Sequence, residues 1–205
     1  MSNHININVN NHSSIQIDDL FFDPFKTENV EKKAKYIFLT HTHYDHLSIE
    51  DIDRVITPET IIFATYDAKE QLEKYSNKII YVKPNEKFEI DNLEIETIPS
   101  YNLNKDFHKK EYNWVGYKIT KDGISYVIPG DTDATPELQE IECDILFVPI
   151  GGTYTMSAEE AATLTNKIMP KLVIPMHYAS IVGTPEDAQV FLDKIDENII
   201  CKIFF

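Results

Sequence analysis

A six-residue stretch, residues 41–46, concentrates the side chains of this chain that are best suited to chemistry. It reads His-Thr-His-Tyr-Asp-His and holds three of the seven histidines together with a carboxylate. His41 and His43 are two positions apart, so both can reach one point from an extended backbone. Asp45 and His46 follow where we expect the chain to turn into a helix, so they can aim at a second, adjacent point. Imidazole and carboxylate together suit zinc, iron, manganese or nickel, and the stretch therefore predicts a metal site.

Two later residues stand at predicted strand ends, where they could complete such a site. Asp131 follows an apolar run and a Pro-Gly breaker, and His177 follows the apolar run at 172–175. Taken alone, an Asp in this position is commonly a turn former or a helix cap, and a single His is commonly a structural residue. Beside residues 41–46, both become candidate metal ligands.

These three pieces together resemble the metallo-β-lactamase superfamily. The resemblance covers nearly the whole chain, from the opening hairpin to His177 and the helix that follows it. Four further segments resemble the small metal-dependent hydrolases related to ascorbate-lactonate lactonases: residues 99–102, 107–108, 114–117 and 151–156. Residues 40–47 also resemble N-acyl-phosphatidylethanolamine phospholipase D, a phosphodiesterase of the same fold. The resemblance implies an α/β fold, the four-layer αββα sandwich, with a metal site at one edge of its two sheets.

The resemblance further implies two divalent metal ions, with zinc expected and manganese, iron or nickel as alternatives. The implied ligands are His41 and His43 on the first ion, Asp45, His46 and His177 on the second, and Asp131 bridging the two. A hydroxide held between the ions would be the nucleophile, since a metal can lower the pKa of its bound water to ~7. Asp45 and Asp131 are the expected catalytic carboxylates, because a carboxylate can accept a hydrogen bond from the attacking water and orient it.

One position departs from the family pattern. The family usually supplies a third histidine to the first ion after a proline, and here Asn102 stands at that place. An amide oxygen is a weaker, neutral ligand for such metals. His108 could supply the missing imidazole if the loop folds back, and the alternative is a surface histidine among charged neighbours. If neither residue serves, the first metal site is weak or empty.

Other candidates concern the substrate and the surroundings of the site. Asn102 and Tyr154 are candidate substrate-binding residues, and the glycines before Tyr154 allow close approach of the backbone to a ligand or metal. His12 lies in the opening hairpin, where a structural turn residue is favoured over a contact with the site. Trp114 and Tyr117 are expected in the core.

Apolar alternation and turn residues predict strands along most of the chain. They are expected at residues 5–9, 15–17, 36–39, 61–65, 79–82, 93–98, 115–119, 125–128, 145–149 and 172–175. Several neighbouring strands are joined by turns too short for a helical crossover. This order therefore favours an α/β layered fold over a simple doubly wound parallel sheet.

Helices are predicted where capping residues precede an apolar stripe. A short helix is expected from Ser48, and a capping box is expected at residues 67–70. A second capping box at residues 157–160 predicts a helix that ends near Met169, because a proline follows. Thr184 is expected to cap a helix with Pro at its first position.

Composition bounds the partners of the chain. Its 205 residues suit one domain, residues 1–205, with a core of its own. The formal net charge of −15 argues against nucleic acid as a partner, because Lys and Arg supply that affinity. We see no signal peptide and no membrane span, and therefore expect a cytoplasmic protein acting on a small molecule. The sequence does not predict the oligomeric state.

Three functions follow, in order of preference. The first is a metal-dependent hydrolase that cleaves an ester-like bond, a lactone or a phosphodiester, in a small polar substrate. The second is a non-catalytic or one-metal member of the superfamily that binds a ligand, suggested by Asn102. The third is a di-iron redox protein, since the same side chains can hold iron. The chain is too short to add the flavin module that such proteins usually carry.

Overall fold

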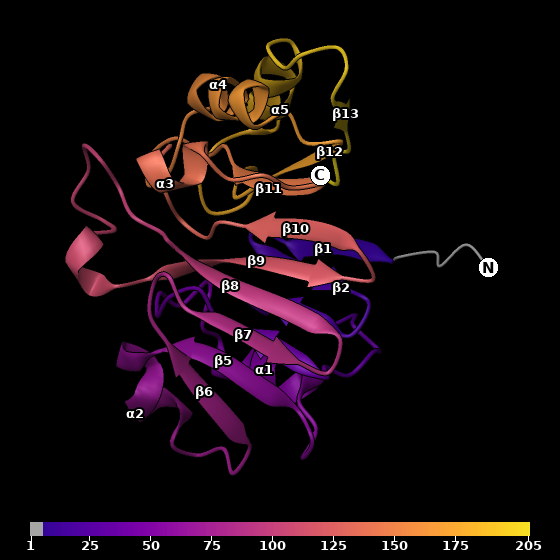
Figure 1. Cartoon of the computed structure of the whole chain (residues 1–205), viewed down its shortest axis with the longest axis vertical. Coiled ribbons are helices and arrows are strands. Elements are labelled where there is room, and N and C mark those ends of the chain that lie inside the picture. The colour runs from indigo at the N-terminus through magenta and orange to yellow at the C-terminus, as the bar shows by residue number, and fades with distance from the viewer. Residues whose placement is uncertain (1–5) are drawn as a thin grey trace. The chain divides into compact units, whose positions relative to one another are not determined.

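The computed structural model describes residues 6–205 (Figure 1). The chain divides into two compact units, one ending at Val82 and the other spanning Lys83–Phe205. The single domain expected over residues 1–205 stays a prediction, and Ile5, placed in the first predicted strand, lies outside the described residues. Between residues 6 and 205, no helix combines the length and the apolar character needed to cross a membrane.

The first unit is built on a six-stranded mixed sheet in the order β1-β2-β3-β4-β5-β6. The strands are β1 (Ile7–Asn11), β2 (Ser14–Ile17), β3 (Leu20–Phe22), β4 (Tyr36–Phe38), β5 (Ile61–Thr65) and β6 (Lys78–Val82). The first three pair antiparallel through tight turns, and the strands from β3 to β6 pair parallel. The predicted hairpin at the start of the chain is confirmed. The three-residue strand β3 was not predicted.

Helix α1 (Ile49–Val55) packs its apolar face into the core of this unit, with Ile52 and Val55 fully buried. The Ser48 side chain accepts a hydrogen bond from the backbone of Asp51 and caps the helix, as predicted. The following segment forms a 3-10 turn, η1 (Tyr66–Ala68), and a short helix α2 (Lys69–Leu72).

The capping box predicted at residues 67–70 is wrong. Asp67 lies inside the 3-10 turn, and neither η1 nor α2 has a side-chain cap. Its carboxylate instead accepts hydrogen bonds from Thr65 Oγ1 at 2.6 Å and Thr42 Oγ1 at 3.0 Å. The Asp67 carboxylate therefore accepts from two hydroxyl groups, and not from the backbone N–H groups of the helix as the local pattern predicted. One of them belongs to the predicted metal-binding stretch.

The second unit contains a seven-stranded mixed sheet in the order β13-β12-β11-β10-β9-β8-β7. Its strands are β7 (Lys87–Ile90), β8 (Leu93–Pro99), β9 (Val115–Lys121), β10 (Ile124–Ile128), β11 (Ile145–Pro149), β12 (Leu172–Met176) and β13 (Ile200–Cys201). Strands β7 to β10 pair antiparallel, and strands β10 to β13 pair parallel. The mixed pairing agrees with the prediction against a doubly wound parallel sheet. Strands β7 and β13 were not predicted.

Helices α3 (Pro136–Gln139), α4 (Ala158–Ile168) and α5 (Pro185–Leu192) belong to the second unit (Figure 1). Alanines and Leu164 of α4 and Phe191 of α5 share one buried cluster with apolar residues of β10, β11 and β12. The capping box at Ser157 and the end of α4 at Met169 are confirmed, as is the Pro at the start of α5. Trp114 and Tyr117 are buried, as predicted. This layer of helices supports the parallel strands whose ends carry the candidate ligands.

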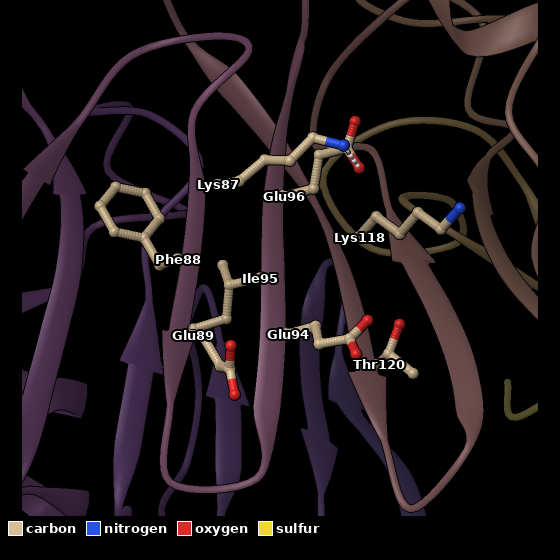
Figure 2. A pocket seen from close by; sticks show the side chains of 8 residues that line it. All are labelled: Lys87, Phe88, Glu89, Glu94, Ile95, Glu96, Lys118 and Thr120. Atoms are coloured by element: carbon tan, nitrogen blue, oxygen red, sulfur yellow. Dashed lines mark ion pairs between the residues drawn. The ribbon is translucent and has the colours of Figure 1, made fainter.

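A hollow of about 450 Å³ lies over strands β7, β8 and β9 (Figure 2). Its lining includes Lys87 and Glu96, whose side chains form an ion pair of 3.1 Å across neighbouring strands. Edge strand β7 carries charged residues in alternation with half-buried ones, which discourages edge-to-edge pairing with another chain. None of the residues predicted for the functional site lines this hollow.

Candidate metal centre

Residues 41–46 lie in the loop after the buried strand β4, and Leu39 and Thr40 connect the two. The Leu39 backbone N–H still donates to Phe63 of the neighbouring strand β5 at 2.8 Å, so the loop starts from a rigid base. The backbone then turns, with the N–H groups of His46 and Leu47 donating to the His43 carbonyl at 3.0 and 2.8 Å. This turn changes the direction of the side chains between His43 and Asp45.

Asp23, a residue that sequence reasoning did not select, anchors this loop from the end of β3. It is buried, and its Oδ1 accepts the Thr40 backbone N–H at 2.8 Å. Its Oδ2 accepts the Thr40 hydroxyl at 2.7 Å and lies 2.7 Å from His46 Nδ1. Burial raises the pKa of the Asp23 carboxyl, and the neighbouring His46 and Thr40 work against that rise.

The hydrogen bonds around Asp23 determine where two imidazoles carry their protons. With Asp23 as acceptor, His46 donates from Nδ1 and keeps the lone pair of Nε2. The Thr40 hydroxyl gives its one proton to Asp23, so it can only accept at its 3.0 Å contact with His41 Nδ1. His41 therefore also presents the lone pair of Nε2. A ring nitrogen must carry its lone pair to bind a metal, and here Nε2 of both rings does so.

The donor atoms of the loop gather in two pairs. His41 Nε2 lies 3.0 Å from His43 Nδ1, and Asp45 Oδ2 lies 3.6 Å from His46 Nε2. Ligand atoms about 2.1 Å from one tetrahedral ion lie roughly 3.4 Å apart, so both separations suit coordination. That the two pairs serve two different points stays a prediction, because a donor atom of His41 also lies within 4.8 Å of one of His46.

His12 adds an imidazole to the second pair. It is fully buried in the turn between β1 and β2, where its φ of 49° lies in the left-handed region. Its Nε2 lies 3.3 Å from Asp45 Oδ2. The turn position agrees with the prediction, but the contact with Asp45 makes His12 a neighbour of the site as well. A contact with the site was the less favoured of the two interpretations of His12 in the sequence.

In the second unit, Asp131 and His177 meet. They follow strands β10 and β12, which flank β11 in a parallel arrangement, so their carboxyl ends lie at the same edge of the sheet. His177 Nε2 lies 2.9 Å from Asp131 Oδ2, and both residues are buried. His177 has a φ of 57°, so the chain leaves β12 through a left-handed residue.

His108 joins this group from the loop between β8 and β9. It is fully buried, unlike a surface histidine, and its Nε2 lies 3.4 Å from Asp131 Oδ2. Asn102, at the end of β8, contacts His108 rather than Asp131: its Oδ1 accepts the His108 backbone N–H at 3.1 Å and lies 3.0 Å from His108 Nδ1. The contact to Asp131 therefore comes from His108 and not from the residue at the family's position.

Tyr154 contacts the loop between β8 and β9. Tyr154 is half-buried, its carbonyl accepts a hydrogen bond from Asn102 Nδ2 at 2.9 Å, and its ring lies 4.7 Å from that of Phe107. The roles of Asn102 and Tyr154 in substrate binding stay predictions.

Each unit thus presents a set of imidazole and carboxylate donors that fits a divalent metal, and all of them except the more exposed His43 are buried. The first holds the pairs at residues 41–46, and the second holds Asp131 between two histidines. In the first unit, hydrogen bonds behind the rings of His41 and His46 aim their lone pairs, as is usual for metal-ligating histidines. The chemistry of such a donor set matches zinc, iron or manganese better than magnesium or calcium, which prefer oxygen.

Comparison with known proteins places the chain in a family. A profile described as "Beta-lactamase superfamily domain" matches residues 7–177, and the chain belongs to this family. A UPF0173 metal-dependent hydrolase of Thermococcus onnurineus is 29% identical over 199 residues, covering 89% of this chain and 88% of that protein.

Solved structures agree with this membership. A protein described as a metal-dependent hydrolase, from Parabacteroides distasonis, superposes with a TM-score of 0.82 at 28% identity, covering 97% of this chain and 92% of that one. A metallo hydrolase from Ignicoccus hospitalis has a TM-score of 0.76 at 22% identity, covering 97% and 94%. The predicted superfamily and fold class are therefore confirmed. The closer kinship with lactonases or with the phospholipase stays a prediction.

Proposed function

We propose that this chain, a metal-dependent hydrolase of the beta-lactamase superfamily, cleaves an ester-like bond, in a lactone or a phosphodiester, of a small polar substrate. The observation that carries the proposal is the pairing of donor atoms in the loop at residues 41–46, at 3.0 Å and 3.6 Å. The names of the relatives support the reaction class. The two resemblances noted in the sequence, to lactonases and to a phosphodiesterase, support the substrate classes.

We assign the ligands as the family pattern suggests, with two divalent ions and zinc as the expected metal. His41, His43 and His108 would hold the first ion, Asp45, His46 and His177 the second, and Asp131 both. Asp131 Oδ2 lies within 3.4 Å of a histidine from each ligand group, His108 and His177, which is what a bridging carboxylate requires. This supports His108 as the third imidazole of the first site.

When bound, the metal supplies a hydroxide at neutral pH and polarises the bond to be broken. The residues of the chain do the rest. Asp23 and Thr40 hold His41 and His46 in the ligating form. Asp45 is proposed to accept a hydrogen bond from the attacking water and so orient it.

The cysteines support a mechanism without a covalent thiol intermediate. Burial raises the pKa of Cys143 to about 12 and that of Cys201 to about 11. A thiol nucleophile needs a lowered pKa instead. The nucleophile is therefore assigned to water rather than to a cysteine side chain.

The test is a hydrolysis assay on protein purified without chelator, with its metal content measured by elemental analysis. The panel would hold simple lactones and an activated phosphodiester. We expect about two ions per chain, and a loss of activity of more than a hundredfold in H43A and D131A. D122A, at an exposed turn, is the matched control and should keep its activity. Full activity in both ligand variants would refute the proposal.

A second candidate is a one-metal member that binds a ligand without turnover. Asn102 at the place of the family's histidine favours it. One ion per chain, tight ligand binding and no hydrolysis by metal-loaded protein would support this candidate over the first. A di-iron redox protein ranks third, and turnover of oxygen by the iron-loaded protein would support it.

A further inference from the structure

We propose that Asn102 is a positioning residue that locks His108 in one tautomer and so aims its Nε2 at Asp131. This inference rests on the proposed metal-dependent function, since it concerns a ligand of that site. Neither the family pattern nor the relatives assign such a role to Asn102.

The orientation of the Asn102 amide follows from three of its contacts. On one side its Nδ2 donates to the Tyr154 carbonyl at 2.9 Å and to Asp133 Oδ1 at 3.2 Å. On the other side its Oδ1 accepts the His108 backbone N–H at 3.1 Å. The reversed amide would place an oxygen against two acceptors and an NH₂ group against an N–H donor. Only one orientation satisfies every contact.

This orientation decides where His108 carries its proton. Oδ1 of Asn102 can only accept, so His108 Nδ1, 3.0 Å away, must be the donor. The neutral ring then has its lone pair on Nε2. That atom lies 3.4 Å from Asp131 Oδ2, to which His177 Nε2 also comes within 2.9 Å. His108 is thus prepared as a ligand before any metal is present.

Asn102 is itself held in place by Asp133. Asp133 Oδ1 accepts Lys105 Nζ at 2.5 Å in addition to Asn102, and its Oδ2 accepts the Leu103 backbone N–H at 2.8 Å. The Asn102 backbone N–H also donates to the His108 carbonyl at 2.7 Å, which closes the loop between the two residues. Each half of the Asn102 amide therefore has a buried partner. Two residues thus replace the missing family histidine: the Asn102 amide positions the ring, and the His108 imidazole would bind the metal.

The test reads the tautomer directly in metal-free protein. Long-range ¹H–¹⁵N spectra distinguish a ring protonated on Nδ1 from one protonated on Nε2, at a pH where the ring is neutral. For wild type we expect the His108 signals of the Nδ1–H form. N102L has a similar volume but cannot accept a hydrogen bond, and should lose this pattern. N102D keeps an acceptor at Oδ1 and should restore the Nδ1–H pattern. Its second oxygen faces the Tyr154 carbonyl and Asp133 Oδ1, so N102D should also have a lower thermal unfolding temperature than wild type.

Metal affinity provides the second readout, by titration of the metal-free protein with zinc alone. Loss of a group behind a ligating histidine typically lowers metal affinity 10- to 100-fold. N102L should therefore lower the affinity for one of the two zinc ions by about that factor. N77L is the matched control. The Asn77 amide also bridges loop carbonyls, those of Thr57 and Thr60, but it contacts no histidine. N77L should lower the thermal unfolding temperature without changing the His108 spectrum or the affinity.

The outcomes separate this inference from the proposed function. A wild-type His108 protonated on Nε2 would overturn the inference, as would an N102L variant with unchanged tautomer and affinity. If N102L fails to fold, the wild-type spectrum and N102D still decide. The expected tautomer with no hydrolysis of any substrate would leave the positioning role intact and count against the hydrolase.

Discussion

Gly151 approaches His177 so closely that a side chain at position 151 has no room. A Cβ atom added there would stand 2.1 Å from the His177 carbonyl oxygen and 2.8 Å from Val182 Cγ2. The first of these contacts is with backbone, which cannot move aside as the end of a side chain can. The glycine thus lets the loop after β11 touch the residue after β12, where a candidate ligand lies.

We therefore expect G151A to displace His177. Overpacking of this kind typically costs 1–3 kcal/mol of unfolding free energy, and the weaker His177–Asp131 contact should also lower metal affinity. Urea denaturation and a zinc titration would measure the two effects. G152A is the matched control, because nothing lies within 4 Å of its added Cβ atom and only its φ of 82° is unfavourable. Equal metal affinities in the two variants would show that His177 is not held by this contact.

The anchor at Asp23 leads to a prediction about the loop ligands. In D23N, an amide NH₂ would face the Thr40 hydroxyl and His46 Nδ1, so the preferred proton positions on His46 and His41 would reverse. We expect metal affinity to fall 10- to 100-fold, as is typical for groups behind ligating histidines. Isothermal titration with zinc would measure it.

D51N serves as the control for D23N. Asp51 is also a buried carboxylate, but it accepts from Thr27 and Ser48 and contacts no histidine. The D51N variant should be less stable than wild type and should keep its metal affinity. An unchanged affinity in D23N would mean that His46 does not depend on Asp23.

The two cysteines should react slowly in the folded protein. Burial raises the pKa of Cys143 to about 12, against an ordinary value of 9.0. Because only the thiolate attacks, its fraction at pH 8 falls about a thousandfold. Reaction with an aromatic disulfide reagent should therefore be slow for the native protein and fast in guanidinium chloride. Fast reaction of Cys143 in the native state would contradict the burial seen here.

The lowered pKa of Asp144 should make the stability of the protein depend on pH. The Lys171 amine, 2.7 Å away, and the Ser125 backbone and hydroxyl donors lower the pKa of Asp144 to about 2. Since the folded-state pKa is depressed, the stabilisation is complete above the unfolded value of 3.8 and disappears as the pH falls towards about 2.

We expect D144N to be less stable than wild type by about 1 kcal/mol at pH 7, allowing for solvent screening. The difference should shrink between pH 4 and pH 2, as followed by urea denaturation. D106N, at a highly exposed carboxylate, should show no such difference. A constant difference at all pH values would rule out the ionised carboxylate as its source.

Local sequence patterns determined the parts of this protein whose causes are local. The stretch at residues 41–46 holds its candidate ligands close in the chain, so spacing alone suggested two donor pairs. Ser157 and Pro185 marked two helix starts because capping involves the neighbouring turn only. Strand-end positions likewise brought Asp131 and His177 into consideration, since parallel strands end at one edge.

Tertiary structure decided what depends on distant partners. Asp67 has the spacing of a capping residue, but Thr42, distant in the chain, takes its carboxylate. Asp23 lies far from His46 in sequence, and no spacing rule connects an isolated Asp to it. Asn102 and His108 were both candidate ligands in the sequence, and only the folded chain shows that the Asn102 amide contacts the His108 ring. Hydrogen-bond direction depends on every neighbour of a group at once, and those neighbours are assembled only when the chain has folded.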